Sequence, residues 1–229
     1  LDAESGQYMI LKQATEHLPD PMYLSDPELV EYSTKGNQKA FGLYYSPKNR
    51  DFTGPEGEKP PLLVKVHGGP TGSVSTSLDL RLQFWTSRGF AVLDVNYGGS
   101  AGYGREYRRR LDGLWGVLDV DDCIKGALYL VGQGKVDREK LAIEGASSGG
   151  YLVLCALTFR DVFKAGVSYY GFGNIEVLAE DFHKFESRYV DRLVGPYPRA
   201  KATYAERSPI HFTKNLSSPV LMFQGTDDT

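Results

Sequence analysis

The chain has 229 residues, a formal net charge of −3 and 24% charged residues, enough length for one α/β domain with a substantial core. This charge balance argues against a broad basic surface for nucleic acid or anionic membranes. No apolar run reaches the length of a membrane span, so we expect no membrane partner.

Residues 1–32 alternate short apolar groups with turns, and residues 8–11 read as a strand. We predict that this stretch is the end of an upstream domain and a linker, and that residues 33–229 form a second domain. The chain starts without methionine and stops just after a predicted strand, so we expect a fragment that lacks sequence at both ends. No signal peptide is recognisable, which favours a cytoplasmic location.

Short apolar runs alternate with segments of helical periodicity along the rest of the chain. Strands are predicted over 36–45, 62–66, 90–95, 141–143, 165–169 and 219–223, and helices over 78–88, 117–131, 151–159 and, in two pieces, 174–195. This alternation predicts an α/β fold with a mostly parallel sheet covered on both faces.

The stretch Gly145-Ala146-Ser147-Ser148-Gly149 fits Gly-x-Ser-x-Gly. It lies between a predicted strand and a predicted helix, which is the context that a nucleophile elbow needs. Ser147 is therefore the candidate nucleophile. The alternative is a plain turn rich in glycine and serine.

A nucleophilic serine needs a base, an acid that orients the base, and donors for the oxyanion. Asp227 and Asp228 follow the last predicted strand and are candidates for the acid, although Gly-Thr-Asp-Asp is also ordinary turn sequence. The amide of Ser148 and an amide of the His67-Gly68-Gly69-Pro70 turn are the candidate oxyanion donors.

The catalytic base is not identified within the chain. In α/β-hydrolases the acid follows the serine and the histidine comes last. His67 precedes Ser147 and is interpreted as structural, whereas His183 and His211 lie between the serine and the aspartates. The base is therefore expected beyond Thr229.

No cofactor or metal is predicted. The histidines are dispersed, and Cys123 and Cys155 lie on apolar helix faces, which favours core packing over a disulfide. The glycines of 98–102 lack dinucleotide-binding spacing, and no lysine follows the glycines of 145–150 as a phosphate-binding loop requires.

Several segments together resemble the catalytic domain of the prolyl oligopeptidase family of serine peptidases, closest to its acylaminoacyl-peptidase and dipeptidyl-peptidase-like branch. The matching segments are His67-Gly68-Gly69-Pro70, residues 96–104, 145–151, 159–166 and 204–210, and Gln224-Gly225-Thr226-Asp227-Asp228. The resemblance covers roughly residues 33–229.

The resemblance implies an α/β-hydrolase fold after a β-propeller, truncated here before its last strand and helix, and a peptide or acyl-peptide substrate. Residues 1–32 would then be the last propeller strand and the linker. The residues that carry over are Ser147 as nucleophile, Asp228 rather than Asp227 as acid, Gly69 and Ser148 as oxyanion donors, and Tyr170 and Phe172 in the S1 pocket.

Two positions depart from the family pattern: Ser148 stands where many relatives have a bulky residue, and Gly98 where many have arginine. Both affect the expected substrate preference. A carboxylesterase-like α/β-hydrolase and a non-catalytic hydrolase-fold fragment remain as alternatives, because fold alone does not separate them from a peptidase.

Overall fold

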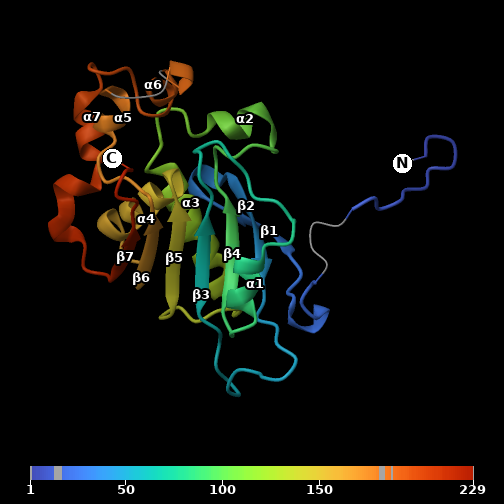
Figure 1. Ribbon diagram of the computed structural model, residues 1–229. Helices are drawn as coiled ribbons and strands as arrows, with labels where there is room; N and C mark the ends of the chain where they lie inside the picture. Colours follow the sequence, from blue (N-terminus) through green and yellow to red (C-terminus); the bar gives the residue numbers. More distant parts are fainter. Residues whose placement is uncertain (1, 13–16, 181–183, 187, 229) are drawn as a thin grey trace.

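The computed structural model describes residues 2–12, 17–180, 184–186 and 188–228. The centre of the molecule is a seven-stranded sheet in the order β1-β2-β4-β3-β5-β6-β7, with helices on both faces (Figure 1). The strands are β1 Glu28–Ser33, β2 Lys39–Tyr45, β3 Leu62–Val66, β4 Ala91–Asn96, β5 Leu141–Ala146, β6 Ala165–Tyr169 and β7 Val220–Phe223.

Strands β3 to β7 run parallel to one another, and β2 is antiparallel to both of its neighbours. The predicted mostly parallel α/β sheet is therefore confirmed. Because the five parallel strands share one direction, the loops after them meet at the carboxyl edge of the sheet, where ligand sites of open α/β sheets lie.

The helices are α1 Leu80–Thr86, α2 Gly104–Arg109, α3 Leu118–Gly132, α4 Ser148–Phe159, α5 Glu176–Glu180, α6 Tyr189–Leu193 and α7 Lys201–Glu206. Short 3₁₀ segments span Pro21–Tyr23, Lys35–Asn37, Lys184–Glu186 and Pro209–Asn215. Two short helices, α2 and α7, were not predicted, because each spans only six residues and shows too little periodicity.

Two apolar clusters cover the two faces of the sheet. Along β4, Leu93 and Val95 belong to the larger cluster, which includes α3 and α4, whereas Val92 packs with Leu82 of α1 in the smaller one. This alternation follows from the two-residue period of a strand. The apolar stripe of α3 faces the larger cluster, as its spacing of three and four residues predicts.

The amino-terminal part differs from the sequence prediction. Residues 8–11 form no strand, and their side chains are 64–86% exposed. The first strand instead begins at Glu28 and pairs with β2, so the sheet starts before residue 33. The sequence did not predict strand β1, because only Val30 and Tyr32 are buried and charged residues interrupt the apolar pattern around them.

None of the helices in the described part of the chain is both long and apolar enough to cross a bilayer.

Candidate active site

Ser147 occupies the sharp turn between β5 and α4. Its φ and ψ are 56° and −121°, a combination that non-glycine residues rarely adopt. The turn is held because the Ser147 amide donates to the carbonyl of Tyr169 at 2.9 Å and the Tyr151 amide donates to the Ser147 carbonyl at 3.0 Å. Ser147 is exposed at the carboxyl edge of the sheet. This is the geometry of a nucleophile elbow.

Glycines around Ser147 allow this turn to form. A Cβ atom on Gly145 would lie 2.5 Å from the carbonyl of Gly149, and one on Gly149 would lie 2.5 Å from the Val66 oxygen. A Cβ on Gly150 would lie 2.8 Å from the Cα of Gly171. The sequence motif identified the first two positions; the contact of Gly150 with Gly171 was missed, and its signal is the doubled glycine after the motif.

The turn that follows β3 lies directly beside the nucleophile. A Cβ on Gly68 would lie 3.0 Å from the Ala146 oxygen and 3.6 Å from the Ser147 Cβ. Gly69 adopts a φ of +57° and is exposed, and its amide donates to no carbonyl of a described residue. Ser148 is the first residue of α4, so its amide has no acceptor within the helix. Two candidate oxyanion donors thus lie on the two segments that flank Ser147.

His67 is fixed beneath this turn. Its ring stacks on Tyr97 with centroids 4.4 Å apart, Nδ1 lies 3.1 Å from the Gly68 carbonyl, and Nε2 lies 2.8 Å from the Ser100 hydroxyl. Because a carbonyl only accepts, Nδ1 carries the proton and Nε2 accepts from Ser100. Burial lowers the pKa of His67. These contacts agree with the interpretation of His67 as structural.

Asp227 and Asp228 lie just beyond β7, which pairs in parallel with β6. The Tyr170 amide donates to the Phe223 carbonyl at 2.6 Å, which ties the ends of these two strands together. Both carboxylates are exposed, and neither side chain hydrogen-bonds to another described residue. Both carboxylates therefore lie at the same edge of the sheet as Ser147. No side-chain contact with a described residue distinguishes Asp228 from Asp227 as the candidate acid.

No histidine contacts Ser147 in the part of the chain that the structure describes. His211 lies in the 3₁₀ segment Pro209–Asn215, and its exposed side chain hydrogen-bonds to no described residue. His183 lies outside the described residues. The base of the site is therefore not among the histidines whose contacts are described.

Tyr170 and Phe172, the predicted pocket residues, differ in their surroundings. Tyr170 has a φ of 41° and is 51% exposed at the end of β6. Phe172 stacks on Tyr151 at 5.2 Å and contacts the edge of Trp115 at 5.9 Å. Tyr170 is therefore open to a ligand, whereas Phe172 is anchored to the aromatic side chains behind the elbow.

Gly98 has no room for a side chain. A Cβ there would lie 2.7 Å from Leu118, 3.1 Å from the Asp122 carboxylate and 3.2 Å from the guanidinium of Arg110. The Gly98 amide donates to Asp122 at 2.8 Å. Burial raises the pKa of Asp122 to about 6, although the amide and Arg110 oppose this. Arg110 thus supplies a positive charge next to position 98.

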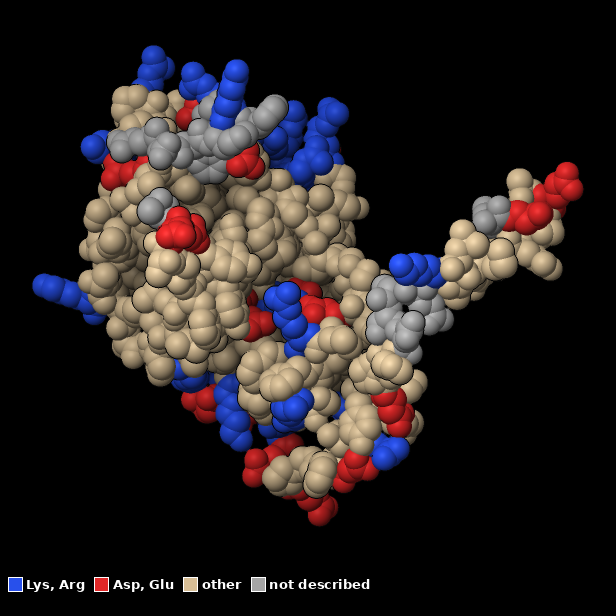
Figure 2. Space-filling view, in the orientation of Figure 1, with Lys and Arg blue, Asp and Glu red and all other residues tan. Residues whose placement is uncertain are grey.

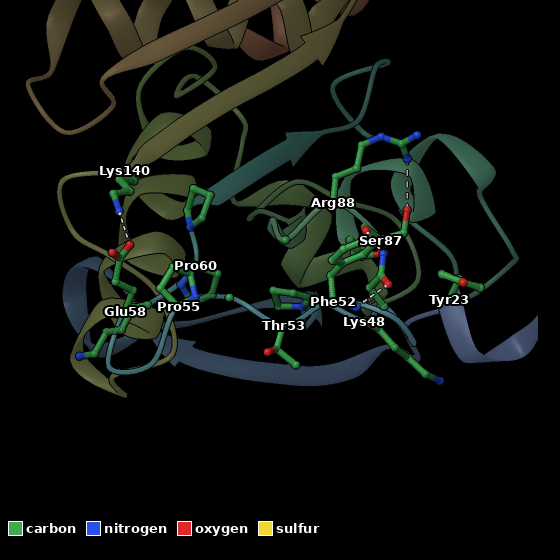
Figure 3. A pocket seen from close by; sticks show the side chains of 17 residues that line it. Tyr23, Lys48, Phe52, Thr53, Pro55, Glu58, Pro60, Ser87, Arg88 and Lys140 are labelled. Carbon is green, nitrogen blue, oxygen red and sulfur yellow. Dashed lines mark hydrogen bonds and ion pairs between the residues drawn. The ribbon is translucent and has the colours of Figure 1, made fainter.

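A separate cavity of about 1110 Å³ lies at the opposite, amino edge of the sheet (Figure 3). Its lining includes Pro61 and Lys140, which immediately precede β3 and β5, and Gly89, which lies two residues before β4. Lys140 and Glu58 form an ion pair at one end, and Arg88 lies at the other. None of the candidate catalytic residues lines this cavity, so we do not assign it to the site.

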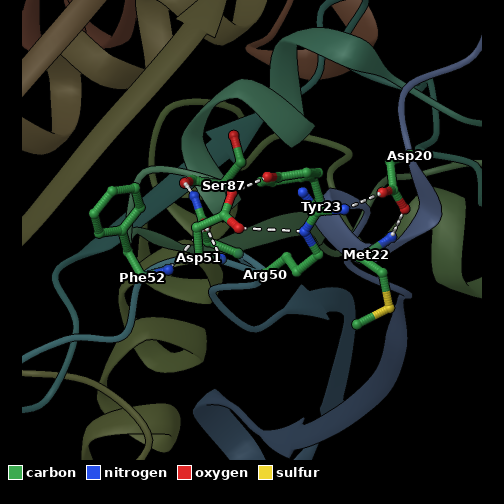
Figure 4. Close-up of polar contacts among 8 residues, drawn as sticks. Asp20, Met22, Tyr23, Arg50, Asp51, Phe52 and Ser87 are labelled. Atoms are coloured by element: carbon green, nitrogen blue, oxygen red, sulfur yellow. Dashed lines mark hydrogen bonds and ion pairs between the residues drawn. The ribbon is translucent and has the colours of Figure 1, made fainter.

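Polar contacts hold one wall of this cavity (Figure 4). The Tyr23 hydroxyl donates to Asp51, and Arg50 pairs with Asp51 at 3.2 Å and with Asp20 at 3.0 Å. Asn49 donates to the Ser87 carbonyl at 2.7 Å. The Asn49 bond fixes the loop before β3 onto the end of α1, and the Tyr23 and Asp20 contacts tie the same loop to the 3₁₀ segment Pro21–Tyr23 and the residue before it.

The chain matches known proteins over most of its length and not only at single motifs. The profile of the prolyl oligopeptidase family matches residues 76–229. Dipeptidyl aminopeptidase BIII of Pseudoxanthomonas mexicana is 31% identical over 207 residues, which cover 87% of this chain and 30% of that protein.

Two solved structures share the fold. A Mycobacterium tuberculosis puromycin-hydrolyzing peptidase superposes with a TM-score of 0.96 at 45% identity, over 98% of this chain and 35% of that one. The acylaminoacyl peptidase of Pyrococcus horikoshii superposes with a TM-score of 0.77 at 30% identity, over 86% of this chain and 31% of that one.

The chain spans about a third of the length of these relatives. Their names confirm the predicted branch of dipeptidyl and acylaminoacyl peptidases, and the superpositions confirm the α/β-hydrolase fold. With the family profile covering residues 76–229, from α1 to the end of the chain, the chain belongs to the prolyl oligopeptidase family.

Proposed function

We propose that the full-length protein is a serine peptidase that hydrolyses peptide or acyl-peptide bonds of short peptides through an acyl-enzyme. The observation that carries this proposal is Ser147, held at a φ of 56° with the Gly68–Gly69 turn beside it. A strained conformation of a polar residue at an exposed edge is a feature of functional sites.

In the proposed reaction the Ser147 Oγ attacks the carbonyl carbon of the scissile bond while its proton passes to a histidine. We propose that this histidine lies beyond Thr229, because the histidine comes last in the Ser-Asp-His order of the triad. Asp228 orients that histidine, and the amides of Gly69 and Ser148 donate to the oxyanion of the tetrahedral intermediate.

Collapse of the intermediate breaks the carbon–nitrogen bond, and the histidine returns its proton to the leaving amine. Water then attacks the ester formed with Ser147 while the histidine accepts its proton; the bond between the acyl carbon and Ser147 Oγ breaks, the histidine returns the proton to Oγ, and the acid product leaves. Each step uses a group that the proposed site supplies, and no metal or cofactor takes part.

The substrate class is supported by the named relatives, which are peptidases of the dipeptidyl, acylaminoacyl and puromycin-hydrolysing kinds. We also propose that residues 1–27, which precede the sheet, lead from an upstream propeller domain. A carboxylesterase activity is the second candidate, because it needs the same serine and oxyanion donors.

Labelling the full-length protein with a fluorophosphonate probe tests the proposal. We expect one label, on Ser147, and no label in S147A. Labelling that persists in S147A would contradict the assignment of the nucleophile. Higher kcat/KM on short acyl esters than on aminoacyl anilides would favour the esterase, and no turnover of either would favour the non-catalytic alternative.

A further inference from the structure

The short helix α2 carries arginines that no acidic group of the described chain neutralises. Arg105 and Arg109 are exposed and Arg108 is half-buried, and none of the three forms an ion pair or hydrogen bond with a described residue. Figure 2 shows Lys and Arg side chains gathered over α2 at the top of the molecule. Only Glu106 opposes them on the helix, so three positive charges against one leave +2 in a chain of −3.

Arg110, the next residue, shows the contrast. It lies 3.9 Å from the buried Asp122, donates to the Lys39 carbonyl at 2.6 Å, and is 14% exposed. Arg110 therefore has a structural role in the fold. Arg105, Arg108 and Arg109 lack such partners, so their charge remains available to a ligand.

Helix α2 is connected to the candidate oxyanion turn through two steps of hydrogen bonding. The Gly99 amide donates to the Tyr107 carbonyl at 3.0 Å, which joins α2 to the loop after β4. In the same loop, the Ala101 amide donates to the Gly72 carbonyl at 2.8 Å, and Ser100 binds His67 at 2.8 Å. The helix thus lies at the carboxyl edge of the sheet and is fixed to the turn beside Ser147.

We propose that Arg105, Arg108 and Arg109 make the enzyme selective for peptides that carry a carboxylate, supplied by an acidic side chain or by a free C-terminus. This inference rests on the proposed peptidase function. Unpaired cations at the edge of a site raise the rate of encounter with anionic substrates, and the effect weakens as salt screens the charges. The three arginines are specificity-determining residues and take no part in bond cleavage.

The test compares kcat/KM of the full-length protein on matched short peptides. One pair differs only by Glu against Gln, and a second pair has either a free or an amidated C-terminus. We expect the carboxylate-bearing member of at least one pair to be preferred by about ten-fold at low ionic strength. The preference should shrink toward unity as salt is raised to about 0.5 M.

The triple variant R105Q/R108Q/R109Q should lose this preference and keep kcat/KM on the neutral peptides within about two-fold. A matched control, K125Q/R138Q/K214Q, removes the same charge from three exposed positions on α3, before β5 and before β7, and should keep the preference. Circular dichroism verifies that the variants fold. If the triple variant unfolds, the single variant R109Q, at an exposed position, replaces it and should lower the preference.

A preference for only one of the two pairs identifies the source of the carboxylate and supports the proposal. No preference in the wild type, or an equal preference in R105Q/R108Q/R109Q, would overturn it. Failure of the peptidase function gives a different result, because the neutral peptides would then also not be hydrolysed.

Discussion

The Cβ position of Gly149 lies 2.5 Å from the carbonyl oxygen of Val66, so the first turn of α4 rests directly on the end of β3. Gly149 is therefore required by packing between two elements that are far apart in the sequence. Real Cβ atoms do not approach a carbonyl oxygen this closely. The nearest atoms are main-chain atoms of Val66 and His67, which cannot move aside as a flexible side chain could.

We expect Gly149→Ala to destabilise the protein by about 1–3 kcal/mol, because the added methyl overpacks a backbone contact. The control is Gly132→Ala at the end of α3, where nothing lies within 4 Å of the added atom. That substitution should be neutral or stabilise by up to about 1 kcal/mol. Urea unfolding of both variants measures the difference, and equal stabilities would contradict the packing argument.

Asp228→Asn should lower kcat by a factor of about 10⁴, because a neutral amide neither holds the histidine in its reactive tautomer nor stabilises the imidazolium. Asp227→Asn is the matched control: the neighbouring carboxylate is equally exposed, and its loss should change kcat by less than about three-fold. Steady-state kinetics of the two full-length variants decide between the residues. The reverse pattern would assign the acid to Asp227.

Ser148→Ala should leave activity within about three-fold of wild type, since the proposed contribution of Ser148 is its main-chain amide. Its hydroxyl is buried and has no hydrogen-bond partner among the described residues. Removing such an orphan hydroxyl is neutral or stabilising. Under the same assay, Ser147→Ala should lose a factor on the order of 10⁶. A large loss in S148A would show that the hydroxyl itself takes part.

Stability should fall as pH rises from about 4 to about 7, partly because of Asp94. Burial raises the pKa of Asp94 from 3.8 to about 7, although Lys65 at 3.9 Å opposes the shift. In this window the folded carboxyl keeps a proton that the unfolded one has lost. The folded state therefore binds more protons, and a higher pH favours unfolding.

Asp94→Asn should reduce this slope by up to about 1.4 kcal/mol per pH unit. The slope should not vanish, because burial also raises the pKa of Asp119 to about 7 and that of Asp122 to about 6. The control, Asp161→Asn, changes an exposed carboxyl and should keep the wild-type slope. Urea unfolding at several pH values measures it; an unchanged slope in D94N would contradict the assignment.

Cys123 and Cys155 should resist a thiol reagent in the folded protein. Both are free and fully buried, and burial raises the pKa of each thiol, so neither thiolate forms at neutral pH. Neither should react with Ellman's reagent until urea unfolds the domain, and then both should react. Peptide mapping assigns the labels, and rapid labelling of either native cysteine would contradict the described packing.

The sequence predicted the parts of the fold that depend on local pattern. The apolar runs of β3, β4, β6 and β7 and the periodicity of α3 were recognisable, and so was the strand–serine–helix order around Ser147. Apart from β7, whose Leu221, Met222 and Phe223 are exposed, these elements bury one or both faces, and burial imposes a pattern on the residues themselves.

The remaining features depend on contacts between distant segments. Helix α2 is held in place because the Tyr107 hydroxyl donates to the Asn96 carbonyl at 2.7 Å, which no local pattern reveals. The pairing of Gly150 with Gly171 and the crowding of Gly98 by Arg110 likewise arise only when the strands are assembled. The strand proposed for residues 8–11 failed for the opposite reason, since apolar residues there find nothing to pack against.

The backbone of Ser147 has a consequence for how the enzyme gains activity during folding. Its unfavourable φ of 56° is held by Tyr169 from β6, while the Gly149 contact needs the end of β3. Residues 66, 147 and 169 are far apart in the sequence. The nucleophile can therefore reach its conformation only after non-local strand pairing, which is slow to form. During refolding, helical signal should therefore recover before catalytic competence does.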